Sequence, residues 1–208
     1  MKLEYLLFAN CEQLKRMNLK PQDILILLKL VAQGDKNWVY SRLAMELNMS
    51  SSEIHAAMKR AYSAGLMRDK GETIMPDAKN LEEFIVYGLK YAFAAERGDM
   101  CMGIPTSYAA KPLCDRVIYD DSSPPPVWPD ENGKVQGIAF RPLYPSVPDA
   151  ARLDSALYEL LTLIDAIRGG RTRERTVAIK EIKLRFTRYA NHNRLGYIQH
   201  VNRRRKTG

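Results

Sequence analysis

The 208-residue sequence contains few cysteines and no long apolar run. Its three cysteines, Cys11, Cys101 and Cys114, form an odd set with no close spacing, which is typical of a protein kept in a reducing compartment. No stretch of 18 apolar residues occurs, so no transmembrane helix is predicted. The first residues include acidic side chains and no small-residue cleavage site, unlike a secretory signal. We therefore expect a cytoplasmic protein with no membrane partner.

Motifs that hold metal ions, phosphates or catalytic nucleophiles are also missing. There is no HExxH or CxxC spacing, no glycine-rich loop with a P-loop lysine, and no nucleophile elbow. The acidic pairs Asp120-Asp121 and Asp130-Glu131 stand beside prolines and turn residues without a histidine, so we interpret them as solvated loop charges. These absences predict a chain that is not an enzyme and uses no metal or cofactor.

The net charge of +8 is unevenly distributed. Thirteen of the 32 lysines and arginines, but only two of the 24 acidic residues, lie from Arg168 onwards, so this end carries +11 and the rest −3. Arg171, Arg173 and Arg175 cluster with Arg168 around a double glycine. Such an excess favours a polyanionic partner such as nucleic acid, or an acidic protein surface. A solvated basic tail explains the charge equally well.

The stretch from Trp38 to Gly65 predicts a short strand followed by two helices. Trp38 to Tyr40 is aromatic and β-branched, which is typical of a strand. A helix from Arg42 to Leu47 follows, with Ser41 as its cap. After a tight turn, Ser50 and Glu53 have the spacing of a capping box, which begins a second helix that Gly65 ends.

The flanking segments predict further helices and a hairpin. Residues 2–17 form a candidate first helix, and Pro21 begins an almost wholly apolar second one, Gln22 to Ala32. Leu66 to Met75 predicts a β-hairpin that Pro76 ends. Asp77 can cap a long helix from Ala78 to about Glu96.

This order of elements, from Pro21 to Glu96, resembles the winged helix-turn-helix domain, and within that superfamily it looks most like the MarR-like bacterial regulators. The serine-led helix that ends in AGLM is the most specific part of the resemblance. The resemblance implies that the helix from Ser50 to Ala64 enters the major groove of double-stranded DNA and that the hairpin contacts an adjacent minor groove or phosphate. It also implies that the helix from Ala78 links domains or dimerises, and the alternative is that this helix simply packs on its own domain. The predicted DNA-binding residues, including the C-terminal arginines, are Ser50, Ser51, Ser52, His55, Lys59, Arg60, Arg68, Lys70, Arg171, Arg173 and Arg175.

The second half of the chain has a different character. Residues 97–147 are rich in proline and glycine and predict an irregular region with one β-hairpin, whose strands Val127-Trp128 and Val135 to Phe140 flank Asn132-Gly133. Residues 148–208 predict one helix to Arg168, a second from Thr172 to Ala190, and a mobile basic tail. The expected fold is mainly α with short β-hairpins, in three parts: 1–96, 97–147 and 148–208.

These features predict a homodimeric transcriptional regulator that binds a specific DNA sequence, represses by blocking polymerase, and is nucleoid-associated when bound. Residues 97–147 are a candidate ligand sensor. The alternative is a protein-interaction module, an adaptor or antitoxin-like partner of a neighbouring enzyme or toxin, with a basic end that binds nucleic acid. RNA binding through the arginine-rich end is a third interpretation, although no common RNA-binding pattern is present.

Overall fold

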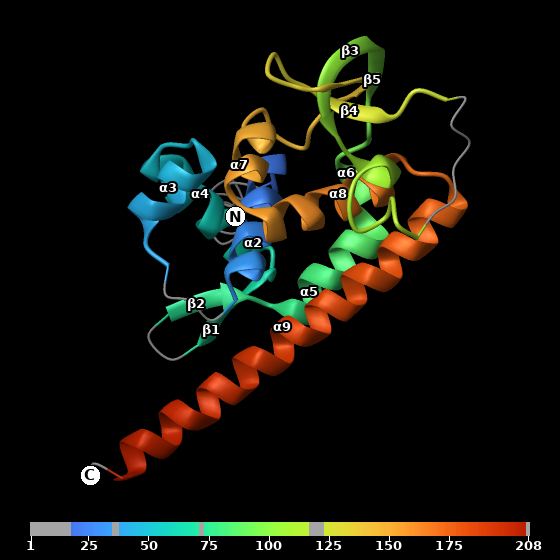
Figure 1. Cartoon of the computed structure of the whole chain (residues 1–208). Coiled ribbons are helices and arrows are strands. Elements are labelled where there is room, and N and C mark those ends of the chain that lie inside the picture. The colour runs from blue at the N-terminus through green and yellow to red at the C-terminus, as the bar shows by residue number, and fades with distance from the viewer. Residues whose placement is uncertain (1–17, 35–37, 71–72, 117–122, 207–208) are drawn as a thin grey trace, which may run out of the picture.

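The computed structural model describes residues 18–34, 38–70, 73–116 and 123–206, and their side chains as far as residue 192 except that of Lys70. Helices make up 58% of the molecule and two small sheets accompany them, so the fold is mixed α/β (Figure 1). The helix predicted over residues 2–17 lies outside the described residues. In the described ranges, no helix combines the length and the apolar character needed to cross a bilayer.

The N-terminal elements surround one buried helix. They are α2 (Pro21–Gln33), α3 (Tyr40–Leu47), α4 (Ser51–Ser63), β1 (Met67–Lys70) and β2 (Thr73–Pro76). Nine residues of α2 are buried, because α4 packs on one side of it and a C-terminal helix on another. The prediction of a buried, apolar α2 with proline in its first turn is confirmed.

The predicted strand at Trp38 to Tyr40 is wrong. Val39 has extended backbone angles, but β1 and β2 pair only with each other, and no other described strand reaches it. Tyr40 already belongs to α3, and its ring meets that of Trp38 edge-on at 5.3 Å. The two aromatic residues pack locally on each other instead of extending a sheet.

The long helix predicted after the hairpin is shorter and irregular. Asp77 does cap it, because its carboxylate accepts the Asn80 N–H. It runs as α5 (Ala78–Glu83), a π-helical turn η1 (Phe84–Gly88) and α6 (Leu89–Ala92), so it ends four residues before Glu96. A π-turn adds one residue to a turn and so rotates the side chains that follow it.

The predicted hairpin of the middle region is also wrong. Both runs are strands, β4 (Pro126–Pro129) and β5 (Val135–Phe140), but they pair in parallel. A third strand, β3 (Arg97–Pro105), lies antiparallel to both and closes a three-stranded barrel. Gly103 on β3 permits this closure, because a Cβ there would lie 2.1 Å from the carbonyl oxygen of Trp128.

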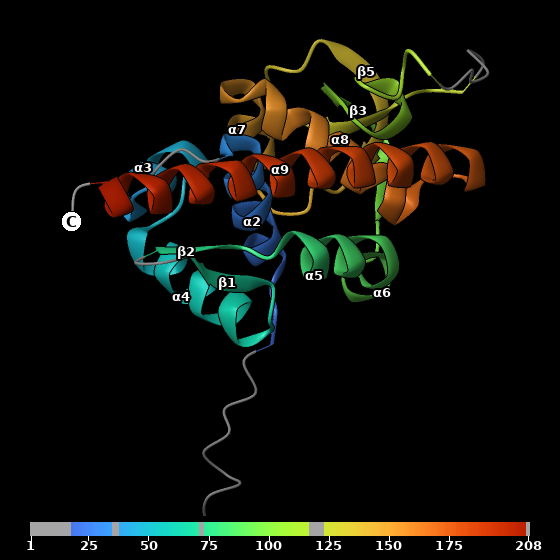
Figure 2. The same ribbon diagram turned by 90° about the horizontal axis from the view of Figure 1, so that it is seen from below.

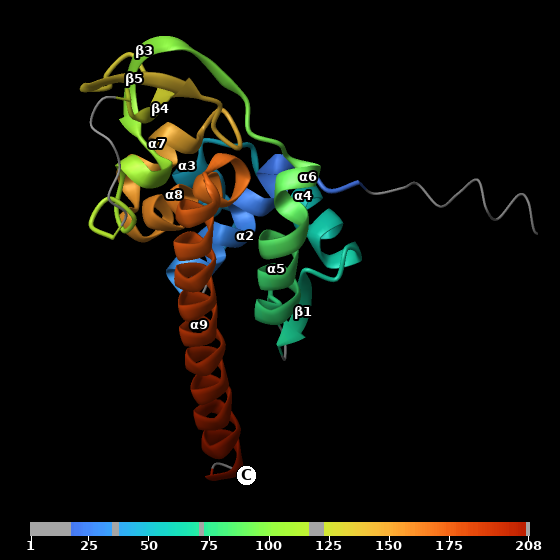
Figure 3. The same cartoon turned by 90° about the vertical axis from the view of Figure 1, so that its right-hand side faces the viewer.

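The C-terminal region contains three helices, α7 (Val147–Leu153), α8 (Ser155–Gly169) and α9 (Thr172–Lys206). The single helix predicted before Arg168 is broken at Asp154, whose extended backbone ends α7 and whose carboxylate caps the N-terminus of α8. α9 continues 16 residues past the predicted end at Ala190. At 1.5 Å per residue it is about 52 Å long, and its C-terminal half projects beyond the rest of the molecule (Figure 3).

A buried ion pair within α8 also binds the barrel through a hydrogen bond from Trp128. The Asp165 carboxylate accepts hydrogen bonds from Thr106 Oγ1 at 2.8 Å and Trp128 Nε1 at 2.6 Å, and lies 2.8 Å from Arg168 Nη1. Arg168 also donates to the carbonyl of Phe93, just past α6. The donors of Thr106, Trp128 and Arg168 therefore all have acceptors, which is the condition under which a buried charge is tolerated.

A second buried charge joins the N-terminal helices to the C-terminal ones. Lys29 on α2 lies 2.8 Å from both Glu46 on α3 and Asp154, and its side chain is 5% exposed. Burial opposes ionisation of Lys29 and of Asp154, but their mutual contact raises the pKa of Lys29 and lowers that of Asp154. Hydrogen bonding to Lys29 likewise lowers the pKa of Glu46.

We predict that Lys29→Met lowers the free energy of unfolding by about 3 kcal/mol at pH 7, because it leaves the Asp154 carboxylate without its cation and leaves Glu46 paired only with the exposed Arg42. Carboxylates with lowered pKa values stabilise the folded state above their unfolded pKa of about 4, and lose that contribution as pH falls through the folded values. The difference in free energy of unfolding between the wild type and Lys29→Met should therefore become smaller below about pH 4. Urea unfolding at several pH values measures it, with exposed Lys79→Met as the control. A pH-independent deficit would contradict this account.

Candidate nucleic-acid interface

α4 begins with a complete capping box, as predicted. The Ser50 hydroxyl accepts the Glu53 N–H at 3.2 Å, and the Glu53 carboxylate accepts the Ser50 N–H at 3.0 Å. Hydrogen bonds from the Ser50 backbone and hydroxyl lower the pKa of Glu53, and Tyr144 donates a further one at 3.3 Å. The carboxylate that opposes a phosphate at this helix end is therefore engaged within the protein.

The outer face of α4 is polar and open to solvent. Ile54, Ala57, Met58 and Ala61 are buried against the core. The exposed residues of the first three turns are Ser51, Ser52, His55, Ala56 and Lys59. Four of the predicted DNA-binding residues therefore share one exposed helix face, with Ser50 at its N-terminal end.

An aromatic residue that the sequence did not suggest lies beside this face. The Tyr40 ring, from the first turn of α3, lies 5.5 Å from the His55 ring at a tilt of 55°. Tyr40 is 36% exposed, so both rings reach the surface. Tyr40 begins a helix instead of ending the predicted strand, and this places its ring beside α4.

Arg60 belongs to the interior instead of the surface. Its Nε lies 2.8 Å from Asp23 Oδ2 and its Nη2 lies 2.5 Å from Asp23 Oδ1, a two-pronged pair between α4 and α2. The Asp23 side chain is 0% exposed. Arg60 is therefore occupied in holding two helices together, and it is removed from the set of candidate phosphate contacts.

The hairpin beside α4 carries little free positive charge. Arg68 is 55% exposed, with its Nε 3.8 Å from a carboxylate oxygen of Asp77. Asp69 accepts a hydrogen bond from the Tyr62 hydroxyl at 2.8 Å. The Lys70 backbone ends β1, and its side chain lies outside the described part of the structure.

The arginine cluster around the double glycine is not a single surface. Arg168 is buried in the ion pair with Asp165, and Arg175 donates to the Gly170 carbonyl at 2.9 Å. Only Arg171 and Arg173 are exposed. They lie at the start of α9, at the opposite end of the molecule from α3, α4 and the hairpin (Figures 1 and 2). These arginines therefore do not form one phosphate-binding surface together with α4.

α9 separates its charges between inside and outside. Its two acidic residues are buried: Glu174 accepts the Arg171 N–H, and Glu181 pairs with Arg116 and Arg185. Lys180, Lys183 and Arg188 are exposed. The C-terminal half of α9 extends toward the same end of the molecule as α3, α4 and the hairpin (Figure 2). It thereby carries the basic C-terminal sequence toward the α4 side.

Comparison with protein-family models, curated proteins and solved structures gives no match. In the ranges that the structure describes, no group of three histidine, cysteine or acidic side chains could hold a metal ion. The two described cysteines, Cys101 and Cys114, are free thiols.

We predict that Arg60→Ala and Lys59→Ala, adjacent substitutions on α4, have different effects on stability. The first should cost about 3 kcal/mol, because it leaves the buried Asp23 carboxylate unpaired. The second should stay within about 0.5 kcal/mol, as at an ordinary exposed site. Urea unfolding of both variants measures the difference. Equal stability of the two would mean that the Arg60 guanidinium is free in solution and available to a phosphate.

Proposed function

We propose that this chain is a sequence-specific, double-stranded DNA-binding transcriptional regulator with a winged helix-turn-helix domain of the MarR-like kind, acting as a repressor. The observation that carries the proposal is the exposed polar face of α4, next to a β-hairpin and supported from behind by the buried α2. An α-helix fits the major groove and reads base edges with residues near its N-terminus. In this proposal α4 is the recognition helix and β1–β2 is the wing.

The residues on the α4 face have the chemistry that this role needs. Ser51 and Ser52 carry hydroxyl groups, which serve as donors or acceptors to phosphates or bases. His55 and Lys59 follow one and two turns later on the same side. Tyr40 extends the face by an aromatic ring. The wing contributes Arg68 and Lys70 to the adjacent backbone.

The exposed face of α4 carries little positive charge, so DNA binding needs further cations to contact the phosphates. We propose that α9 supplies them. Five lysines and arginines occur after Asn191, with no acidic residue among them. Contacts from cations to phosphates release counterions and give most of the salt-dependent affinity of DNA-binding proteins. We assign backbone affinity to α9 and sequence preference to α4.

We extend the proposal to a homodimer that binds a pseudo-palindromic site. Two tyrosines one helical turn apart, Tyr87 and Tyr91, are 65% and 78% exposed on the helix that follows the hairpin. Exposed aromatic side chains of this size are enriched at protein interfaces. They support a contact between two copies through this helix, which would place two α4 helices on one duplex.

A different observation favours the alternative function, a protein-interaction module. Met100 and Met102 on β3 are each 46% exposed, and Leu153 at the end of α7 is 71% exposed. Exposed methionines are common at adaptable binding surfaces. Under this alternative the barrel docks an adaptor or toxin-like partner, and DNA binding is absent or nonspecific.

The triple variant Ser52→Ala, His55→Ala, Lys59→Ala should lose at least about tenfold in the ratio of specific to nonspecific affinity, because base contacts are worth about 1–3 kcal/mol each. Fluorescence anisotropy measures it with duplex DNA from upstream of the protein's own gene and a scrambled duplex of equal length. Lys134→Ala, an exposed lysine in the β4–β5 loop, is the control. An unchanged ratio in the triple variant would exclude α4 as the recognition helix.

Truncation after Asn191 should weaken binding to both duplexes while preserving their ratio. Removing up to five phosphate contacts should lower the magnitude of the slope of log affinity against log salt by up to about 4.5. Titrations at four or more salt concentrations give the slope, and circular dichroism checks the fold. If affinity and slope remain those of the full chain, α9 does not contact DNA.

A further inference from the structure

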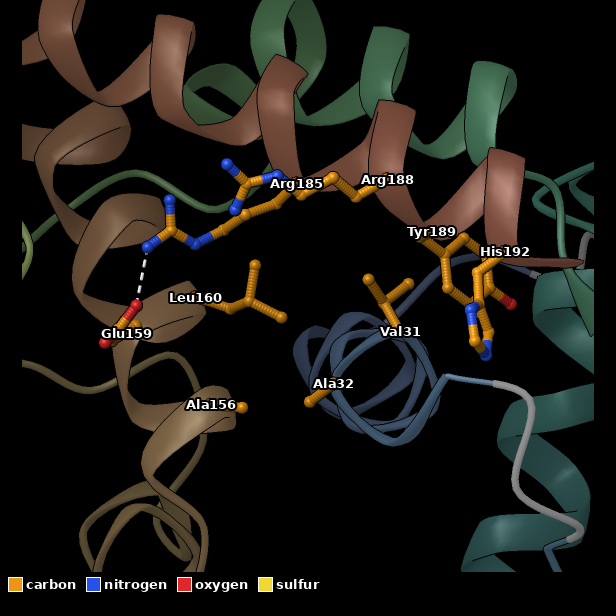
Figure 4. Close-up of a pocket in the computed structure, with 9 residues that line it drawn as sticks. All are labelled: Val31, Ala32, Ala156, Glu159, Leu160, Arg185, Arg188, Tyr189 and His192. Carbon is orange, nitrogen blue, oxygen red and sulfur yellow. Dashed lines mark hydrogen bonds and ion pairs between the residues drawn. The ribbon is translucent and has the colours of Figure 1, made fainter.

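Three helices that are distant in sequence leave a cavity between them. The end of α2, the first turns of α8 and the middle of α9 line an open pocket of about 330 Å³ (Figure 4). Cavities of roughly 300–1,000 Å³ are the usual size of small-molecule sites. The cavity lies apart from the exposed face of α4 and takes no part in the proposed DNA contacts.

The floor of the cavity is apolar. Val31 and Ala32 from α2 face Ala156 and Leu160 from α8 across it (Figure 4). Val31 and Leu160 are 7% and 3% exposed, so they present the edge of the hydrophobic core. The accessible apolar surface of the floor comes from the half-buried Ala32 and the exposed Ala156, and a hydrocarbon or ring that covers them removes this area from water.

One wall of the cavity is cationic. Arg185 and Arg188 lie on the same side of α9, and both guanidinium groups point along the wall toward α8 (Figure 4). Arg185 is neutralised, because it pairs with Glu159 at 2.5 Å and with Glu181. Arg188 is exposed, and the ion pairs found between described residues include Arg185 but not Arg188.

The local charge balance therefore favours an anion. Glu181 is shared between Arg116 and Arg185, so two carboxylates face three arginines, with His192 at the far end of the cavity. Guanidinium groups bind carboxylates and phosphates in a two-pronged geometry that ammonium groups cannot match. A single negative charge beside Arg188 completes the balance.

We propose that this cavity binds a small organic anion with an apolar body, a carboxylate or phosphate monoester whose charge lies against Arg188 and whose hydrocarbon covers Ala32 and Ala156. The ligand would join α9 to α2 and α8 at the point where α9 leaves the molecule. The proposal does not depend on DNA binding, and its test uses no DNA.

The test is displacement of 8-anilinonaphthalene-1-sulfonate, itself an apolar anion, followed by its fluorescence on the full chain. Octanoate should displace it at a concentration at least about tenfold lower than octanol, which lacks the charge, or acetate, which lacks the apolar body. Arg188→Gln should weaken octanoate about tenfold and leave octanol unchanged. Arg173→Gln, an exposed arginine on the same helix outside the cavity, is the matched control and should change neither.

Ala156→Leu tests the apolar floor separately. Ala156 is exposed in the first turn of α8, so a larger side chain enters the cavity without disturbing the core. It should weaken octanoate and the dye together, with circular dichroism unchanged. Equal displacement by octanoate and octanol, or wild-type octanoate affinity in Arg188→Gln, would overturn the proposal.

Discussion

Two buried charges on α2 join it to its neighbouring helices. α2 is otherwise almost wholly apolar, and nine of its residues are buried. Asp23 and Lys29 each need a partner, because a buried charge left unpaired costs about 3–5 kcal/mol. Asp23 is met by Arg60 on α4, and Lys29 by Glu46 on α3 and Asp154 at the start of α8. The candidate DNA-binding face and the C-terminal region are thus positioned from the same helix.

The features that the sequence predicted correctly are local ones. The capping box of Ser50 and Glu53, the cap by Asp77, and the apolar α2 all depend on residues within a few positions of one another. The buried pattern of α4 was also predictable, because helical periodicity is a short-range signal. These features established the helices and the exposed face of α4.

The features that the sequence did not predict depend on distant partners. Arg60 looks like a surface residue until Asp23, 37 positions earlier, is placed beside it. The parallel pairing of β4 and β5 follows from β3, a segment whose composition predicted irregular structure. Asp154 breaks the predicted helix where its carboxylate can bind both Lys29, 125 positions away, and the amides of α8. Propensity and periodicity carry no information on such contacts.

The continuity of α9 has a consequence for how its end is oriented. An α-helix makes one turn in 3.6 residues, or about 100° per residue. The direction in which the side chains beyond the α8 and α5 contacts point is therefore set by the number of residues between them and those contacts. Inserting one residue near position 191 would swing the basic end about 100° around the axis and advance it about 1.5 Å, with no change in composition or core. The length of the projecting half of α9 therefore fixes both the distance and the direction of the basic end relative to the rest of the molecule.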